Sequence, residues 1–479
     1  MANLIDTLAA SGGAEPAGFI NDIVEQLWPN ICVAGAKIAK EVVEPILAST
    51  LPGPLSSLHF IKLDLGHVPV RFSNVDVHKT TTQGIKLDMD LDWKGVCDIE
   101  LDGNHIPKIG IEKVQLNGRL SILLCPLTNI IPLIGAAQVA FINPPSLKLD
   151  FTDAANIADC FMINKVVRNT ILGIISSMAV LPNRFLVKLD SNNDYFKTYQ
   201  PRQGILRLTV EKATSISAPT KKKSGASRLL AKIVKDVPDC YVKVKIGAEE
   251  EWRTSIQKNN HEPVWNETHD FLVADYEQVI SVDIQDEDLG GDDDMGVGYT
   301  TVRDILLKGG SQELGLSHKD MPIDARLTMH AKFYNFVAEP QLLSTQNSGS
   351  QDQICGLVTI LIASVLGLQG QRDELNPSVQ VTWGAKKFVT TAQTYTPGMD
   401  IFNPAFDQAF TIPLTADVLA NPGSFKISLL NKKVETGSVE VGFQDVIGAP
   451  GMVREDSFDV GGGAAVRASI SAYGIQLAQ

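Results

Sequence analysis

The chain has 479 residues with an ordinary hydrophobic fraction, which predicts two to four domains, each large enough for a core of its own. Its formal net charge of −13 argues against a protein whose main partner is nucleic acid, because phosphate binding requires a basic face. The six cysteines are scattered with no Cys-x-x-Cys pair, so we expect reduced thiols in a cytosolic setting.

The first elements of the chain are expected to be helices. Residues 1–14 are expected to form a flexible leader, and they lack the basic and apolar regions of a signal peptide. Apolar side chains then recur at helical spacing over residues 19–28, and Pro29 is expected to break this helix. A second amphipathic helix is expected over residues 31–47.

From residue 58 onward the apolar side chains alternate with polar ones, as is typical of half-buried strands. The clearest strand covers residues 85–94, where apolar side chains face one way and charged side chains the other. A helix is expected later, over residues 163–181. Its second half is apolar nearly all round, so we expect this helix to be covered on every side.

Between Arg119 and Lys148 the chain carries no charged residue. The stretch is long enough to span a bilayer as a helix, but Pro126 and Pro132 fall inside any such helix, and residues 144–145 are prolines that end it. Three alternatives remain at this stage: a short transmembrane hairpin, an ordinary buried core, or the wall of a cavity that accepts an apolar ligand. We expect no transmembrane segment in this sequence.

Several short segments of the first half occur in a fixed order: residues 19–22, 27–29, 44–47, 63–69, 87–93 and 181–184. Together they resemble the SMP lipid-transfer domain of the extended synaptotagmins and their plant and yeast relatives. The resemblance implies a TULIP-like tubular domain over residues 15–192, in which a twisted antiparallel sheet and helices form an open-sided cylinder. It also implies glycerophospholipid or diacylglycerol as cargo, and a homodimer formed through this domain.

An apolar wall suits such a cargo, because leaving an acyl chain in water costs about 0.8 kcal/mol per methylene. The alternative for any single apolar residue is that it packs a dry core. The residues expected to line the lipid groove are Leu87, Met89, Leu91, Trp93, Leu120, Ile122, Leu124, Ile131, Leu133, Ile134, Val139, Leu147, Leu149, Ile171, Ile174, Ile175 and Met178.

The pattern of residues changes again after residue 204. An alternating strand, a basic loop, the segments 238–245 and 262–267, and an acidic loop at 286–296 follow one another. Taken together they resemble a C2 domain, an eight-stranded β-sandwich, over residues 200–335. The expected fold class is therefore α+β followed by all-β.

The acidic loop suggests a calcium site, because Ca²⁺ takes six to eight oxygen ligands, mostly carboxylates. We expect Asp239, Asp286, Asp288 and Asp293 to bind it. Calcium-binding C2 domains normally have a further aspartate in the first loop, which is missing here, and Asp236 is the only nearby acid that could substitute. The alternative is a solvated acidic turn.

Basic residues near this loop are candidates for binding the headgroups of anionic phospholipid membranes. They are Lys221, Lys222, Lys223, Lys243 and Lys245. An ordinary solvated strand face is an equally good interpretation of the last two.

Residues 336–353 are expected to form a linker. The remaining residues, 354–479, contain worn versions of two C2 motifs, at 376–381 and 403–408, which predicts a second, degenerate C2 domain. Where its calcium loop should be, residues 431–435 are Asn-Lys-Lys-Val-Glu, which lack the aspartates of a calcium loop. We therefore expect a calcium-independent module for protein contact, intramolecular docking or weak membrane contact.

The sequence contains no nucleophile elbow, phosphate loop or dinucleotide fingerprint, so we expect no enzyme activity. The favoured hypothesis is a lipid-transfer protein that a calcium-binding C2 domain docks on the cytosolic face of membranes, at contact sites between endoplasmic reticulum and plasma membrane. The alternatives are a calcium-dependent tether or scaffold without lipid transfer and, least favoured, a phospholipase that carries a C2 domain.

Overall fold

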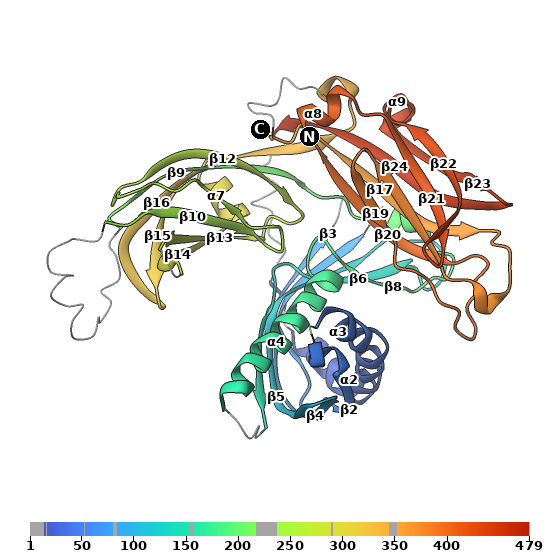
Figure 1. The fold of residues 1–479 in the computed structure, drawn as a ribbon, viewed down its shortest axis with the longest axis horizontal. Helices are drawn as coiled ribbons and strands as arrows, with labels where there is room; N and C mark the ends of the chain where they lie inside the picture. The colour runs from blue at the N-terminus through green and yellow to red at the C-terminus, as the bar shows by residue number, and fades with distance from the viewer. Residues whose placement is uncertain are drawn as a thin grey trace.

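The computed structural model describes residues 14–15, 17–51, 53–79, 84–152, 157–216, 237–288, 291–343 and 352–478. An N-terminal domain of helices and a curled sheet is followed by two β-sandwiches, which we call the first and the second sandwich (Figure 1). No helix within these described ranges is long and apolar enough to cross a membrane.

The first helices form one nearly continuous rod: α2 (Gly18–Ile38), the π-helical η1 (Ala39–Val43) and α3 (Glu44–Thr50), followed by the 3₁₀ turn η2 (Gly53–Ser57). The break expected at Pro29 is wrong, because the helix continues through it. Proline removes one backbone donor, and here Pro29 lies on the exposed side of the helix, where water can satisfy the freed carbonyl group. The neighbouring Trp28 is buried and donates its Nε1–H to the carbonyl oxygen of Gly66 at 2.9 Å.

The sheet of the N-terminal domain is antiparallel, with the order β1-β3-β4-β5-β6-β8, while β2 pairs with β4 and β7 with β5. The long hairpin of β4 and β5 is its centre, and the strand expected over 85–94 forms the first half of β4. The strands are β1 (Ala14–Glu15), β2 (His59–Asp64), β3 (Arg71–Lys79), β4 (Ile85–Gly103), β5 (Ile106–Leu124), β6 (Ala136–Phe141), β7 (Ser146–Phe151) and β8 (Phe185–Lys188).

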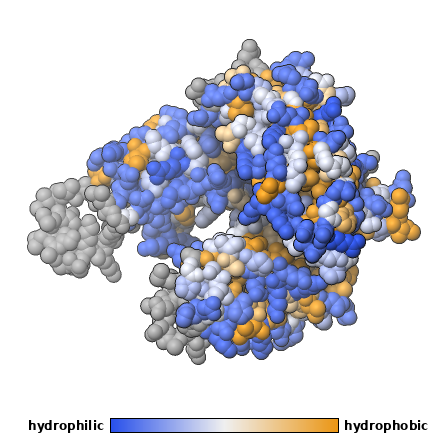
Figure 2. Space-filling model, turned by 45° about the vertical axis from the view of Figure 1, so that its right-hand side comes forward, coloured by the Kyte–Doolittle hydropathy of each residue, from blue (hydrophilic) through white to orange (hydrophobic). Residues whose placement is uncertain are grey.

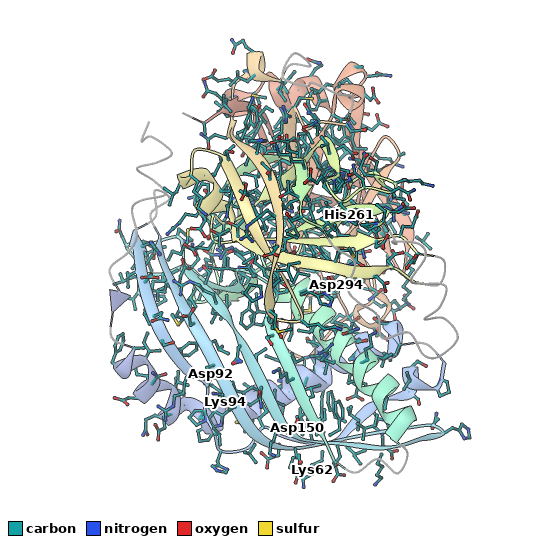
Figure 3. All side chains as sticks on the ribbon, turned by 90° about the vertical axis from the view of Figure 1, so that its left-hand side faces the viewer. Lys62, Asp92, Lys94, Asp150, His261 and Asp294 are labelled. Atoms are coloured by element: carbon teal, nitrogen blue, oxygen red, sulfur yellow. The ribbon has the colours of Figure 1, made fainter. Side chains whose placement is uncertain are left out.

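The two faces of this sheet differ. Figure 3 labels Asp92, Lys94 and Asp150 on the outer face, and all three are exposed. The opposite face lies toward α2 and α4 (Ile157–Ala179) and carries apolar side chains. The uncharged stretch supplies the end of β5, all of β6 and the start of β7, so its charge-free sequence is explained largely by this inner face.

The expectation that α4 is covered on every side is wrong. Lys165, Asn169, Gly173 and Ser177 follow one another at a spacing of four residues, and all four are exposed. Ile174 is buried, whereas most other apolar residues of the helix are half-buried. The helix therefore has a narrow face of small and polar residues that packs against nothing in the described part of the domain.

The first sandwich follows the short helix α5 (Tyr195–Thr198). Its core includes Leu208, Val244 and Ile284, all fully buried. Its elements are β9 (Gly204–Thr214), β10 (Cys240–Ile246), β11 (Trp252–Arg253), β12 (Val264–Val273), β13 (Val279–Asp286), β14 (Asp293–Thr301), α7 (Val302–Leu307), β15 (Ser311–His318) and β16 (Met321–Val337).

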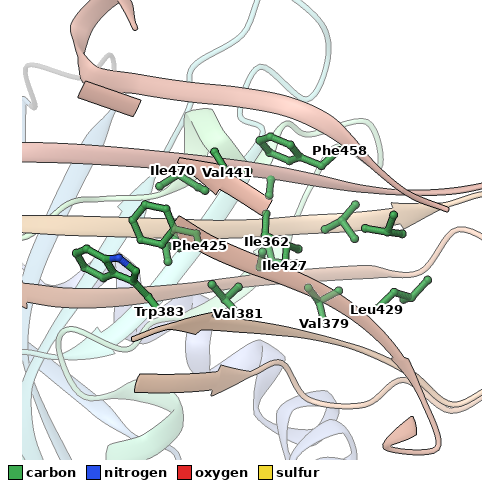
Figure 4. Close-up of a cluster of buried hydrophobic side chains, with 14 of the residues drawn as sticks. Ile362, Val379, Val381, Trp383, Phe425, Ile427, Leu429, Val441, Phe458 and Ile470 are labelled. Carbon is green, nitrogen blue, oxygen red and sulfur yellow. The ribbon is translucent and has the colours of Figure 1, made fainter. Parts of the chain in front are cut away.

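The second sandwich repeats this order of elements around a core with Trp383, Phe425 and Ile427 at its centre (Figure 4). Its elements are β17 (Gly356–Leu366), η5 (Arg372–Glu374), β18 (Pro377–Trp383), β19 (Lys386–Val389), β20 (Ala405–Leu414), α8 (Ala416–Ala420), β21 (Ser424–Asn431), β22 (Val434–Gly442), α9 (Phe443–Ile447), η6 (Pro450–Met452), β23 (Val453–Gly461) and β24 (Ala464–Leu477).

The two sandwiches are joined by strand pairing. The end of β16, from Tyr334 to Val337, pairs with the end of β24, from Leu477 back to Gly474, so that one sheet continues into the other. The turn η3 (Pro340–Leu342) packs beside β24, where a Cβ on Gly474 would lie 2.6 Å from the Leu342 side chain. The part of the expected linker that the structure describes is thus held against the second sandwich.

Both sandwiches also contact the N-terminal domain. On the first, Lys86 Nζ lies 2.5 Å from Asp275 and 2.9 Å from Asp88, and all three side chains are largely buried. On the second, Lys188 lies 2.6 Å from Asp407. Arg467 of the second sandwich also lies 3.2 Å from Asp194, and this pair is more exposed.

Candidate functional site

The inner face of the curled sheet carries an unbroken apolar row. Val77, Leu87, Ile122, Val139 and Phe185 stand opposite one another across β3, β4, β5, β6 and β8, so their side chains point to the same side of the sheet. The two end residues are exposed and the three middle ones are half-buried. A complete apolar row that remains open to solvent over its whole width differs from an ordinary core, whose side chains are closely packed.

The rest of this face is divided into two clusters. One surrounds Trp28 and Trp93, whose rings meet edge to face with centroids 5.7 Å apart, and the other surrounds Met89 and Phe141. Half-buried Leu91 and Leu116 contact both clusters. The inner face is therefore apolar from one end of the domain to the other.

A cavity of about 590 Å³ opens between α3 and α4. Ile46 and Leu51 line it from the α3 side, and Val166 and Ile174 line it from α4. Its polar lining residues are Thr50, Asn169, Thr170 and Ser177. The narrow polar face of α4 is thus the rim of an apolar cavity, which explains why no other element covers it.

The residues expected to line a lipid groove fall into three groups. Met89, Trp93, Leu120, Leu147 and Ile174 are buried, and of the whole set only Ile174 lines the cavity between the helices. A second group is half-buried: Leu87, Leu91, Ile122, Leu124, Ile134, Val139, Leu149, Ile171, Ile175 and Met178. The last two, Ile131 and Leu133, are exposed on the loop between β5 and β6 and are not brought to the inner face.

Sequence reasoning missed both ends of the apolar row and most of the cavity. Phe185 lies on β8, which pairs with β6 far away in the sequence, and Val77 lies on β3, which pairs with the adjacent strand β4. Thr50 and Asn169 line the cavity but are polar, so a search for apolar residues does not find them. A usable signal did exist at one place, because Phe185, Val187 and Leu189 alternate with other residues, as one face of a strand does.

The acidic loops of the first sandwich lie side by side. The backbone N–H of Asp239 donates to Oδ1 of Asp286 at 2.7 Å, and Asp286 pairs with Asp293 across β13 and β14. A carboxylate oxygen of Asp239 accepts from the backbone N–H of Asn259 at 2.7 Å. Burial, followed by the carboxylates of Asp286 and Asp239, raises the pKa of the Cys240 thiol to about 12, so this thiol stays protonated.

These carboxylates match calcium in kind but are not gathered as a closed site. Within the described parts of the chain, no three Asp, Glu, His or Cys side chains are grouped closely enough to hold a metal ion. Asp288 is exposed on the loop that follows β13, and Asp236 lies outside the described residues. The Asp286 carboxylate lies beside the backbone of Asp239, and Asp288 stands on the loop that follows Asp286 and leads to Asp293.

The expected headgroup lysines divide in the same way. Lys221, Lys222 and Lys223 lie outside the described residues. Lys243 and Lys245 are half-buried on β10, where the Nζ atom of Lys243 lies 5.7 Å from the centre of the Tyr241 ring. Their charges therefore face one side of the first sandwich.

The second sandwich has a tight turn where the first has its acidic loop. Strands β21 and β22 pair up to Asn431 and Val434, so Lys432 and Lys433 alone form the turn, both with positive φ. The backbone N–H of Asn376 donates to Oδ1 of Asn431 at 2.7 Å, which reproduces the bond between Asp239 and Asp286 with amides in place of carboxylates.

Two family models match this chain. Residues 13–190 match the synaptotagmin-like mitochondrial-lipid-binding domain, and residues 204–315 match the C2 domain. A solved structure of the SMP, C2A and C2B domains of Extended-Synaptotagmin 2 is similar in fold, with a TM-score of 0.65 and 22% identity, and the match covers 97% of this chain and 100% of that one.

Two extended synaptotagmins are similar to this chain in sequence. The chain is 30% identical to Extended synaptotagmin-2 of Mus musculus over 287 residues, which are 59% of this chain and 33% of that protein. It is 29% identical to Extended synaptotagmin-1 of Mus musculus over 300 residues, or 62% of this chain and 27% of that protein. The chain thus spans about a third or less of the length of these relatives.

Proposed function

We propose that this extended synaptotagmin-like chain, with its SMP domain and C2 domains, carries glycerolipids between two membranes. The observation that supports this most directly is the open apolar row from Val77 to Phe185. A row of this kind offers acyl chains an apolar wall that is still accessible. The cargo expected from its chemistry is a glycerophospholipid or diacylglycerol.

The energetics favour such a wall. Each methylene of an acyl chain that leaves water gains about 0.8 kcal/mol, so a long chain gains on the order of 10 kcal/mol. The cavity of about 590 Å³ between α3 and α4 falls within the usual size range of ligand sites, roughly 300 to 1,000 Å³. Its polar rim, with Thr50 and Asn169, is suited to the ester and headgroup end of the lipid.

The first sandwich is proposed to dock the chain on anionic membranes when calcium binds. Asp239, Asp286, Asp288 and Asp293 would hold the ion, which would supply positive charge at the membrane surface. The hydrogen bond from the Asp239 backbone N–H to the Asp286 carboxylate supports this proposal, because it brings the two acidic loops together. Lys243 and Lys245 add positive charge on a neighbouring strand.

A second copy of the chain is the proposed partner of α2. Phe19, Ile23, Leu27 and Ile31 recur every four residues on this helix, and all four are exposed. Such a stripe of apolar side chains is the usual form of a helix face that packs against a partner. Sedimentation of an Ile23→Glu variant tests it, because a monomer is expected where the unchanged chain is a dimer.

The proposed place of action is the cytosolic face of membranes at contact sites between endoplasmic reticulum and plasma membrane. No catalytic role is proposed. The alternative function is a calcium-dependent tether that moves no lipid, in which the inner face is only a core. The half-exposed apolar row favours transfer over this alternative, because a dry core would be closed.

The test is native mass spectrometry of the purified chain followed by a transfer assay between vesicles. Bound glycerolipid at a fixed stoichiometry is expected, and Ile122→Trp in the middle of the row should lower both bound lipid and transfer rate several-fold. Lys94→Trp on the outer face of the neighbouring strand is the matched control and should change neither. A chain that stays free of lipid after incubation with vesicles would establish the tether instead.

A further inference from the structure

Residues 125–135, which we call the mouth loop, join β5 to β6 and expose a cluster of large apolar side chains. Ile130 is 69% exposed, Ile131 88% and Leu133 55%, and Leu127 is also exposed. Elsewhere, the face seen in Figure 2 is largely hydrophilic, with apolar residues in small separate patches. An exposed apolar cluster on one turn indicates a surface that leaves water in a bound state.

The mouth loop carries no charge. It lies inside the stretch from Arg119 to Lys148 that lacks charged residues, so moving it into hydrocarbon desolvates no ionised side chain. A loop that contacts a protein partner has no need of this property, because polar partners can compensate its charges. Complete absence of charge fits a lipid interior best.

Part of the backbone of the mouth loop is hydrogen-bonded within the loop. The N–H of Thr128 donates to the carbonyl oxygen of Leu133 at 2.8 Å, and the N–H of Leu133 donates to that of Ile130 at 2.6 Å. The Thr128 hydroxyl donates to the same Ile130 oxygen at 3.0 Å. Pro126 and Pro132 have no N–H to satisfy. Unpaired backbone groups oppose entry into hydrocarbon, so each of these bonds lowers the cost of inserting the loop.

The base of the mouth loop lies against β8, the last strand of the described sheet order. The carbonyl oxygen of Gly135 accepts from the backbone N–H groups of Leu189 and Asp190, both at 3.0 Å. Phe185, Val187 and Leu189 expose apolar side chains along this strand, and Phe185 is also the end of the inner apolar row. The apolar surface of the domain interior therefore continues to the mouth loop.

Lys197 and Asp190, one charged residue of each sign, lie near the base of this surface. Lys197 is exposed, and its carbonyl oxygen accepts from the Cys125 thiol at 3.6 Å. The nearby carboxylate of Asp190 accepts from the backbone N–H of Asn192 at 2.9 Å. An apolar tip with a lysine at its base is complementary to an anionic bilayer, where hydrocarbon lies below a layer of negative headgroups.

We propose that the mouth loop inserts into an anionic bilayer and sets the free edge of β8 against the membrane. Insertion itself is a property of the mouth loop and goes beyond the proposed function. The consequence that lipid enters and leaves the inner face at this edge rests on the proposed function. The two parts are separated by the experiments that follow.

Insertion is measured by placing a tryptophan at the tip. Trp28, Trp93, Trp265 and Trp383 are buried and Trp252 is half-buried, so the fluorescence that Ile131→Trp adds to that of the unchanged chain reports the mouth loop. Vesicles of brominated phosphatidylcholine with phosphatidylserine, in the absence of calcium, should quench it and shift its emission to the blue. Val33→Trp is the control, because Val33 is 73% exposed on α2. The C-terminal half of this helix, at Gly35, packs near Leu65 and not near β8. Equal fluorescence with and without vesicles would overturn the proposal.

Function is measured with Ile130→Glu combined with Ile131→Glu. These side chains are exposed, so folding should be unaffected, while affinity for the same vesicles without calcium should fall at least about tenfold. Transfer should fall in parallel, and lipid bound to the purified chain should stay unchanged because the inner face is intact. Val33→Glu should alter none of these quantities.

Other outcomes separate the alternatives. If the double variant binds vesicles normally but sediments as a smaller species, the mouth loop is an interface between copies and the membrane proposal is wrong. If vesicles quench the fluorescence of Ile131→Trp but the unchanged chain never carries lipid, the mouth loop inserts into membranes and the proposed transfer function is wrong.

Discussion

The two sandwiches share a fold and even its local hydrogen bonds, and they differ in the chemistry placed on it. In the first, Val242 N–H donates to Thr254 at 3.0 Å, and in the second Val379 N–H donates to Thr390 at 2.9 Å. Asp239 and Asp286 of the first correspond to Asn376 and Asn431 of the second, with the same 2.7 Å bond. The comparison teaches that this bond stabilises the fold, whereas the negative charge is an addition to it.

The loops differ in length as well as in charge. Between β13 and β14 the first sandwich has residues 287–292, whereas Lys432 and Lys433 alone connect β21 to β22 in the second. A turn of this size cannot surround an ion that takes six to eight ligands. The two sandwiches therefore differ in both loop charge and loop length. Residues of the second sandwich can be copied into the first to remove its proposed calcium ligands without unfolding it.

The largest expected effect comes from copying the amides of the second sandwich into the first. Asp239→Asn with Asp286→Asn preserves the bond between these positions, so folding should be retained. Because calcium affinity depends on the number of charged ligands, the calcium concentration needed for binding to anionic vesicles should rise at least about a hundredfold. Vesicle sedimentation over a calcium titration measures this.

The reciprocal variant is the control for that experiment. Asn376→Asp with Asn431→Asp adds charge to the second sandwich but leaves its short turn, so no second calcium response should appear. Vesicle binding by the unchanged chain that is the same in calcium and in chelator would contradict the assignment of the site.

The next largest effect concerns how each sandwich is attached. Burial alone would raise the pKa of Asp275, but Lys86 outweighs this and lowers it, while Asp275 and Asp88 raise the pKa of Lys86 against the effect of burial. Asp275→Asn removes one of the two carboxylates that neutralise Lys86 and should lower the free energy of unfolding by about 1.5 to 3 kcal/mol, because Asp88 still pairs with Lys86. Calorimetry of the full chain is the measurement, and a loss below about 1 kcal/mol would show that the contact is not a buried pair in solution.

The same pair has a defined pH dependence. Because the pKa of Asp275 in the folded chain lies below its usual value, its contribution is complete above the unfolded pKa of about 3.9. It is lost as the pH falls through the lowered value. The Asp275→Asn variant should lose this part of the acid sensitivity.

The attachment of the second sandwich should be much less sensitive. Arg467 and Asp194 form an ion pair at 3.2 Å, and their side chains are 38% and 26% exposed. Solvent screens such a pair, so Asp194→Asn should cost less than about 1 kcal/mol in the same calorimetric experiment. A loss as large as that of Asp275→Asn would mean that the two attachments are energetically alike.

The sequence was most informative where one element decides the outcome. The alternation over residues 85–94 was sufficient to predict half of β4, and the acidic loop with its flanking motifs was sufficient to predict the first sandwich. Leu87, Ile122 and Val139 of the apolar row were predicted as groove residues, but their alignment in one row and its extension to Phe185 could not be predicted, because both depend on strand register and on the pairing of β6 with the distant β8. Ile131 and Leu133 were misplaced for the opposite reason, since an apolar residue carries no sign of whether it faces protein, lipid or water.

The smallest expected effect is a pH dependence of stability that only the first sandwich should show. His269 stacks on Trp252 with ring centroids 5.2 Å apart, and the matching pair in the second sandwich is Phe388 with Phe410 at 5.4 Å. Burial lowers the pKa of His269, against the opposing effects of Asp270 and Asp352. The neutral ring is therefore favoured in the folded state, and the first sandwich should lose stability as the pH falls below about 6.5.

His269→Phe copies the second sandwich and should remove this part of the pH dependence. Thermal unfolding of the full chain between pH 7.5 and 5.5, a window of about two units around the usual histidine value, provides the measurement. An unchanged slope in the variant would assign the pH dependence to other groups.

The pairing of β16 with β24 has a mechanical consequence. A β-ladder resists bending, unlike a flexible linker, so the two sandwiches behave as one stiff lever arm. Torque that a membrane applies at the 286–293 loop is carried along this arm to the contact between Lys188 and Asp407, at the end of β8. If the first sandwich docks on a bilayer as proposed, its angle on the membrane would set the direction in which the edge of the N-terminal domain at β8 points.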